Sequence, residues 1–301
     1  MPSSGKIGRL SVSVNSFVCS KLGTNKMLKN FSKPPFGWVG CKGWARRQAI
    51  ELSTIFFPVS CVSCGQDICS NQSQGNRVTG NDIPLCEACR FELIDLCPRC
   101  GKCGLLRCGK SPCHLCQKIA QRLGVDNILW QRMFVLGSYR DGLRESVLAG
   151  KRPSGEGLVE ALSGLLIEQH PAICDLELDA VVPVPMHWRK RWARGTNSAN
   201  TMARHIASRL RVPYRCDVKH KVFTRSQKLL SAKMRPTNVS HKFSVMGSQL
   251  TGKRVLVVDD VATTGATLSA ITRCLLEIDA AVVYAAVLAR TDEVMNSENN
   301  R

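Results

Sequence analysis

The chain has 301 residues, of which 44% are hydrophobic, and its 42 basic and 23 acidic side chains give a formal net charge of +19. This length accommodates one domain of ordinary size and a smaller one, and the positive charge predicts a polyanionic partner or an anionic substrate. No apolar run reaches the roughly 18 residues of a membrane-spanning helix, so we expect a soluble protein without a membrane span.

The N-terminal segment has the composition of an unfolded tail. Residues 1–50 contain nine basic side chains and no acidic one, and residues 1–48 are rich in Ser, Gly, Lys and Asn without a sustained period. We interpret 1–48 as a disordered basic tail, with an organellar targeting peptide as the alternative. Residues 44–57 then show the apolar spacing of an amphipathic helix, which Pro58 ends.

Eleven of the 16 cysteines lie between Cys61 and Cys116, and most of them form CxxC pairs. Two consecutive sets fit C-x2-C-x21-C-x2-C and C-x2-C-x12-C-x2-C. Because a CxxC turn directs two thiolates at one tetrahedral ion, each set predicts a closed structural zinc site. The predicted ligands are Cys61, Cys64, Cys86, Cys89, Cys97, Cys100, Cys113 and Cys116. The N-terminus shows no secretory signal, so we expect a reducing, cytoplasmic location.

The assignment of the second set leaves an ambiguity open, because Cys100 and Cys103 also form a CxxC pair. Cys69, Cys108 and His114 stand outside both sets. A redox-active CxxC is the alternative, but no βαβ pattern flanks these cysteines. Residues 104–111 also satisfy the formal pattern of a nucleotide-binding P-loop, yet no strand precedes them and no helix follows, so we interpret them as a loop between zinc ligands.

Strand-like and helix-like segments alternate in the remainder of the chain, which favours a parallel α/β sheet. After a linking segment at 119–128, the pattern predicts strands at 133–139, 180–184, 255–258 and 281–288, and helices at 142–149, 157–167, 198–210 and 268–278.

The segment 255–268, VLVVDDVATTGATL, carries the strongest functional signal. Four apolar residues read as a buried strand, Asp259 and Asp260 stand at its carboxyl end, and a Thr- and Gly-rich turn leads into a helix. A helix N-terminus offers unpaired N–H groups to a phosphate, and carboxylates accept hydrogen bonds from ribose hydroxyls. The predicted phosphate-binding residues are Val261, Ala262, Thr263, Thr264, Gly265, Ala266 and Thr267.

This segment resembles the phosphoribosyl-diphosphate (PRPP) loop of type I phosphoribosyltransferases, and together with the cysteine pairs it resembles the ComF/GntX competence-associated family over residues 57–290. The resemblance implies a type I phosphoribosyltransferase-like parallel sheet with an N-terminal cysteine-rich zinc-binding module. It also implies two structural zinc ions on the eight cysteines, and PRPP bound with Mg²⁺. Asp259 and Asp260 are the expected catalytic acids.

Two further segments match the family. VPVP at 182–185 precedes an Arg-Gly-x-Asn sequence, so the resemblance implies that Arg194, Gly195 and Asn197 bind pyrophosphate. Residues 224–245 keep the family's spaced Thr, Gln, Leu, Arg, Asn and Phe, and the resemblance implies Arg235 as the catalytic cation. A basic surface loop and solvated charges are the alternative interpretations of these segments. Tyr139 to Arg144 and Lys151 also match and would line the site from a neighbouring element.

The predicted organisation is a tail at 1–48, a helix with a double zinc-finger module at 49–125, a phosphoribosyltransferase-like domain at 126–293 and a second tail at 294–301. The resemblance implies binding of PRPP or another phosphoribosyl compound, with phosphoribosyl transfer to an acceptor that the residues do not identify. The alternative is a non-catalytic protein of DNA uptake, in which the zinc module and the basic stretch 186–242 contact single-stranded DNA or a DNA-uptake helicase.

Overall fold

The computed structural model describes residues 60–68, 83–106, 113–186, 197–221 and 243–292. All of them belong to one compact unit, Ser53–Arg301. The helix expected at 44–57 lies outside the described residues.

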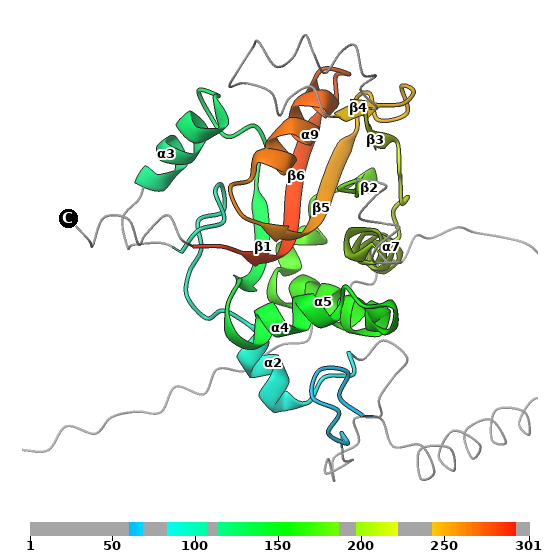
Figure 1. The fold of residues 1–301 in the computed structure, drawn as a ribbon. Coiled ribbons are helices and arrows are strands. Elements are labelled where there is room, and N and C mark those ends of the chain that lie inside the picture. The colour runs from blue at the N-terminus through cyan, green and yellow to red at the C-terminus, as the bar shows by residue number, and fades with distance from the viewer. Residues whose placement is uncertain (1–59, 69–82, 107–112, 187–196, 222–242, 293–301) are drawn as a thin grey trace, which may run out of the picture. The chain divides into compact units, whose positions relative to one another are not determined.

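The described residues contain a four-stranded, all-parallel sheet in the order β1-β6-β5-β2 (Figure 1). Its strands are β1 (Met133–Ser138), β2 (Ala180–Pro183), β5 (Arg254–Ala262) and β6 (Val282–Arg290). Val257 of the central strand β5 pairs with Val182 on one side and Ala285 on the other. Both faces of these strands are buried, which explains their continuous apolar sequences. The predicted parallel α/β sheet is confirmed.

Three helices cover one face of the sheet: α4 (Asp141–Ala149), α5 (Glu156–Gln169) and α7 (Ser198–Leu210). Their buried side chains share one hydrophobic cluster with Phe134, Leu256 and Val258 of the strands. Helix α5 is buried on most of its surface, so it shows only a weak amphipathic pattern. Two short 3-10 helices, η1 (Pro153–Gly155) and η2 (Pro171–Ile173), flank it.

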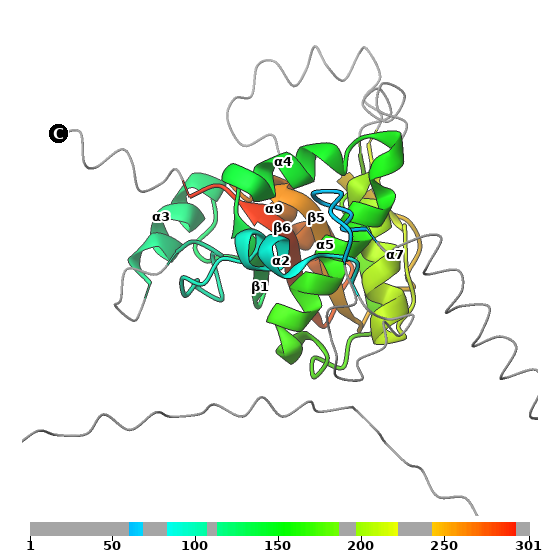
Figure 2. The same cartoon turned by 90° about the horizontal axis from the view of Figure 1, so that it is seen from below.

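The opposite face packs against α9 (Ala266–Leu276), as Figure 1 shows. Helix α3 (His114–Leu123) lies to the side of β1 in both views (Figures 1 and 2) and contributes buried side chains to the same hydrophobic cluster. Val255 and Val257 alternate with Leu256 and Val258, so that β5 contributes to both faces. A third short helix, α2 (Glu87–Leu93), begins directly after Cys86, whose thiol accepts a hydrogen bond from the Cys89 amide.

Apart from shifts of one or two residues at the ends of elements, the structure differs from the predicted elements in three places. Strand β5 extends through Asp259 and Asp260 to Ala262, because β6 runs beside it as far as Arg290. The linking segment expected at 119–128 is in part helix α3, which begins after Cys113 and ends at Gly124 with φ 65°. A two-stranded antiparallel sheet of β3 (Val218–His220) and β4 (Phe243–Val245) was not predicted, since three-residue strands carry almost no periodic signal.

Candidate functional site

The turn between β5 and α9 comprises Thr263, Thr264 and Gly265. Gly265 is the N-cap of α9 with φ 83°, a left-handed conformation that side chains with a Cβ adopt at a cost. A Cβ at this position would also lie only 3.2 Å from the ring of Trp130. Both the backbone conformation and the close approach therefore require glycine here.

The turn presents donors to solvent at the carboxyl end of the parallel sheet. Thr263 and Thr264 are exposed, and the Ala266 amide donates to Thr264 Oγ1 at 3.2 Å. Among the hydrogen bonds of the described residues, none uses the backbone amides of Thr264 and Gly265. The first turn of α9 adds further amides without helical acceptors and the positive end of the helix dipole. This arrangement is suited to bind a phosphate group.

The two neighbouring acids lie just before this turn. Asp259 is partly buried, and its Oδ1 accepts a hydrogen bond from the Asp260 amide at 2.9 Å. Burial and the nearby Asp260 charge raise the pKa of Asp259 to about 8. The Asp259 carboxyl therefore holds a proton near neutral pH and would ionise readily once a cation approaches it.

Lys151, just beyond the C-terminal end of α4, reaches the second acid: its Nζ lies 3.1 Å from Asp260 Oδ2, and both side chains are largely buried. The sequence placed Lys151 near the site only through the family resemblance. The contact puts a cation from the α4 side of the sheet directly beside the acidic pair.

The other predicted anion-binding segment leaves the same edge of the sheet. Pro183 at the end of β2 pairs with Val258, and the Val184 amide donates to the Val258 carbonyl at 2.8 Å. Asn197, where the segment returns, is the N-cap of α7, and its side chain makes no capping hydrogen bond. Arg194, Gly195 and Arg235 lie outside the described residues.

Eight cysteines form two separate clusters, and the four thiols within each cluster lie close together. Cys61, Cys64, Cys86 and Cys89 form the first cluster, and Cys100, Cys103, Cys113 and Cys116 form the second. Within each cluster the sulfur atoms lie within 4.8 Å of one another, and three of the distances are 3.7, 3.6 and 3.8 Å. Four thiolates at about 2.3 Å from a tetrahedral Zn²⁺ would be about 3.8 Å apart. Both clusters therefore fit zinc.

The thiols of the second cluster share protons. A hydrogen bond from the Cys103 thiol lowers the pKa of Cys100 to about 4, and the same contact together with burial raises the pKa of Cys103. A divalent ion would replace the shared protons and stabilise all four thiolates.

The second cluster differs from the predicted ligand set at one position, because Cys103 takes the place expected for Cys97. The Cys100 amide donates to the Leu105 carbonyl, and the Gly104 amide to the Cys100 carbonyl, both at 2.8 Å. These bonds fold 100–105 into a tight turn, the cysteine knuckle, which brings Cys100 and Cys103 together. Cys97 is exposed, and its amide donates to Asp95 Oδ1.

Comparison with known proteins agrees with this description. Residues 196–297 match the phosphoribosyl transferase domain family. The chain is 28% identical to competence protein F of Haemophilus influenzae over 244 residues, which cover 78% of this chain and 98% of that protein. It is 30% identical to DNA utilization protein YhgH of Escherichia coli over 217 residues, 69% of this chain and 90% of that protein. Competence protein ComFC of Bacillus subtilis is 24% identical, over 65% of this chain and 79% of that protein.

Solved structures with local similarity include an allosteric regulatory enzyme of purine biosynthesis, at 22% identity and a TM-score of 0.33, with 47% of this chain and 30% of that chain covered. A purine phosphoribosyltransferase from Pyrococcus horikoshii is also 22% identical, with a TM-score of 0.28 and coverage of 44% and 72%.

The parallel sheet, the acid pair before a Thr/Gly turn and the matched domain define an α/β protein of the phosphoribosyltransferase-like class with two cysteine clusters that could hold metal ions. Given the extended similarity to the proteins above, the chain belongs to the ComF/GntX competence-associated family. None of the helices in the described residues combines the length and apolar character that crossing a bilayer demands.

Proposed function

We propose that this protein binds PRPP, or a related phosphoribosyl compound, with Mg²⁺ at the β5–α9 turn, and that it transfers the phosphoribosyl group to an acceptor. The main support is the juxtaposition of two acids, Asp259 and Asp260, with a solvent-facing turn that has free amides and threonine hydroxyls at the start of α9. No other part of the described chain combines these groups.

Each group has a distinct role in this proposal. The amides and hydroxyls of 263–267 bind the 5-phosphate, and Asp259 and Asp260 accept hydrogen bonds from the ribose hydroxyls. Lys151 holds Asp260 in place from α4. During transfer the bond between C1 and the pyrophosphate oxygen breaks, pyrophosphate leaves with the electron pair, and the acceptor donates a pair to C1. The chain contributes orientation and cations, for which Arg194 and Arg235 are the proposed residues.

The residues also fit Mg²⁺, which prefers carboxylate oxygen ligands. The partly buried Asp259 carboxyl, whose pKa is raised by burial and a like charge, gains a compensating charge when a cation is present. When bound, Mg²⁺ would neutralise negative charge on the diphosphate.

A binding measurement with two matched glycine variants tests this proposal. Isothermal titration of the wild-type protein with PRPP and Mg²⁺ should give saturable heat, and Gly265→Ala should weaken binding at least tenfold because the new Cβ strains the turn against Trp130. Gly252→Ala is the control, since Gly252 also has a positive φ, 70°, but no atom within 4 Å of its Cβ position. Absence of heat for the wild type, or equal losses in the two variants, would contradict the proposal.

A second function, binding of single-stranded DNA, is favoured by the relatives named for competence and DNA utilization and by the basic stretch 186–242. In its described part, Arg204 lies over the ring of Tyr214, 5.3 Å from the ring centre, and Arg211 and Lys219 are exposed. Cations beside aromatic rings are typical of surfaces that bind single strands.

Salt dependence tests this second function. We expect the affinity for a fluorescent oligonucleotide to fall with salt, and replacing Arg204, Arg211 and Lys219 by Gln to reduce the slope of log K against log salt by about 2. Replacing Arg122, Lys253 and Arg273 by Gln removes the same charge outside this stretch and should leave the slope nearly unchanged. A salt-independent affinity, or equal slopes in both triple variants, would argue against DNA binding by this stretch.

A further inference from the structure

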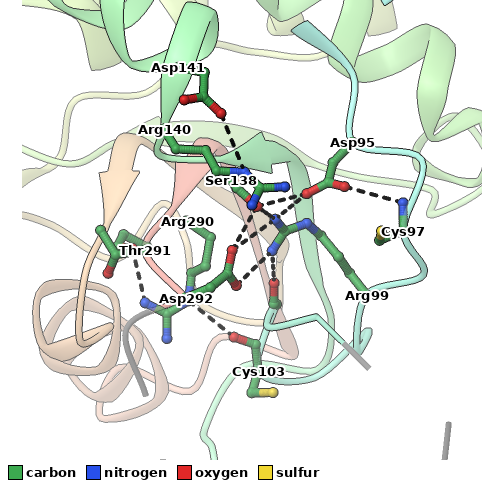
Figure 3. Close-up of polar contacts among 12 residues, drawn as sticks. Asp95, Cys97, Arg99, Cys103, Ser138, Arg140, Asp141, Arg290, Thr291 and Asp292 are labelled. Atoms are coloured by element: carbon green, nitrogen blue, oxygen red, sulfur yellow. Dashed lines mark hydrogen bonds and ion pairs between the residues drawn. The ribbon is translucent and has the colours of Figure 1, made fainter. Parts of the chain in front are cut away.

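A buried arginine connects the second cysteine cluster to the phosphate-binding turn. Arg290, the last residue of β6, is only 1% exposed. Its Nε donates to the carbonyl oxygen of Cys103 at 3.3 Å, while its Nη1 donates to the carbonyl oxygens of Ala262, at 2.9 Å, and Thr263. One guanidinium group therefore contacts both a cysteine of the second cluster and the start of the turn. Figure 3 shows the Arg290 contact with Cys103.

A second connection reaches the other end of the turn. Trp130 is fully buried, and its Nε1 donates to the carbonyl oxygen of Lys102, which lies between the ligands Cys100 and Cys103. The far edge of the same indole ring packs beneath Gly265, the N-cap of α9. Arg290 therefore connects the cysteine knuckle to the start of the turn, and Trp130 connects it to the end of the turn.

A polar network fixes the knuckle itself, as Figure 3 shows. Arg99 donates to the Gly104 carbonyl at 2.7 Å and forms ion pairs with Asp95, at 2.7 Å, and Asp292, at 3.2 Å. Asp292 follows Thr291, whose amide donates to the Ala262 carbonyl at 3.1 Å. The chain just after β6 therefore binds the knuckle on one side and the turn on the other.

Charge and geometry make this connection sensitive to the metal. Four thiolates around a divalent ion carry a formal charge of −2, which complements the buried cation of Arg290. Without the ion the four thiolates repel one another, so the cluster must protonate or open. Opening of the cluster would displace Cys103, whose carbonyl oxygen accepts one of the Arg290 hydrogen bonds.

We propose that Arg290 and Trp130 are positioning residues that make the conformation of the phosphate-binding turn depend on metal binding at the second cysteine cluster. The metal and a phosphorylated ligand would then favour each other by the same factor, as linkage requires. This inference rests on the proposed function for its ligand. The first cluster serves as an internal control, because it packs on the opposite face of the sheet, where Ser63 Oγ lies 3.4 Å from Ser146 Oγ of α4.

Hydrogen exchange in the full-length, zinc-loaded protein tests the coupling without any ligand. Cys113→Ser removes a ligand from the second cluster, and Cys64→Ser removes one from the first. We expect exchange of the Ser269 and Thr291 amides, which donate to the carbonyl oxygens of Gly265 and Ala262 at the two ends of the turn, to become about tenfold faster in Cys113→Ser and to remain at the wild-type rate in Cys64→Ser. Equal exchange in the two variants, with zinc loss confirmed by metal analysis, would overturn the proposal.

Titration with ribose 5-phosphate provides the second measurement. We expect its affinity to fall about tenfold in Cys113→Ser but not in Cys64→Ser. Arg290→Lys keeps the positive charge but has a single nitrogen, so it should keep bonds to the turn and lose the bond to Cys103. In this variant zinc should remain bound, while removal of zinc from the second cluster should lower the affinity less than in the wild type, because only the Trp130 connection remains. Full metal dependence in Arg290→Lys would exclude the assigned role.

Trp130→Phe keeps most of the ring and removes the donor to Lys102, and it should reduce the metal dependence even if Arg290→Lys does not fold. The two proposals fail separately in this design. Metal-dependent exchange without ribose 5-phosphate binding would refute the proposed function and support the coupling. Ribose 5-phosphate binding that is equally tight with and without the second metal would refute the coupling alone.

Discussion

Asp259→Asn is expected to stabilise the folded protein while it abolishes binding of PRPP with Mg²⁺. The pKa of Asp259 is raised to about 8 in the folded state by burial and by the Asp260 charge, compared with about 3.9 in an unfolded chain. Between these pH values the folded state holds a proton that the unfolded state has lost, so this group lowers the free energy of unfolding as pH rises. Asparagine does not ionise, so Asp259→Asn removes this pH-dependent loss of stability.

The stabilisation by Asp259→Asn should therefore be larger at pH 8 than at pH 5, by roughly 3–4 kcal/mol, as measured by urea unfolding at both pH values. PRPP affinity, measured by titration with Mg²⁺ at pH 8, should fall at least a hundredfold, because the neutral amide cannot supply the negative charge that the cation requires. A variant that is less stable than the wild type at pH 8 would contradict the burial of this carboxyl.

Asp179→Asn is the matched control at the opposite end of β5. Asp179 accepts a hydrogen bond from the Arg254 amide at 2.8 Å and pairs with Lys253 at 3.3 Å. The backbone hydrogen bond, more than the ion pair, lowers the pKa of Asp179, so its carboxylate stabilises the protein above the unfolded pKa and this contribution is lost as pH falls. The same substitution should therefore destabilise the protein at pH 8.

The sequence predicts the strand, turn and helix start at 255–268 well because their signal is local. Four apolar residues followed by acids, threonines and glycine specify a strand, a turn and a helix start within fourteen residues. What the local pattern could not predict is that β5 continues through Asp259 and Asp260. Acidic residues have a low propensity for strands. Here strand β6, which follows β5 after helix α9, pairs with Asp259 and the residues up to Ala262, and this pairing overrides the low propensity.

The contacts that support the site depend on tertiary structure and have no local signal. Lys151 meets Asp260 across more than one hundred residues, and Arg290 meets Cys103 across 187. One clue was present for Arg290: it ends the apolar run VVYAAVLAR of a buried parallel strand. A charge in such a place needs buried acceptors, and in parallel sheets these lie near the functional edge.

The overlap of two CxxC pairs explains why the spacing did not determine the second ligand set. Residues 97–103 contain three cysteines at equal intervals, so a pattern that pairs Cys97 with Cys100 fits as well as one that pairs Cys100 with Cys103. The folded knuckle separates the two because Gly104, with φ 75°, packs against Met133 and Val135 of β1. This contact fixes the knuckle at Cys100 and Cys103, one cysteine further along the chain than the predicted pair Cys97 and Cys100.

Cys103→Ser should consequently remove one of two bound zinc ions, whereas Cys97→Ser should keep both. Cys103 is fully buried within the second cluster, and Cys97 is exposed outside it. Because the binding free energy of a structural zinc ion contributes directly to folding, the Cys103→Ser variant should also lose several kcal/mol of stability, on the order of 3–5 kcal/mol. Metal content per chain and thermal unfolding of both variants measure these effects. Loss of one zinc ion from Cys97→Ser, with both ions retained by Cys103→Ser, would support the ligand set predicted from the spacing. Cys103 would then bind no metal, so the Arg290 contact with Cys103 would not be linked to the metal site.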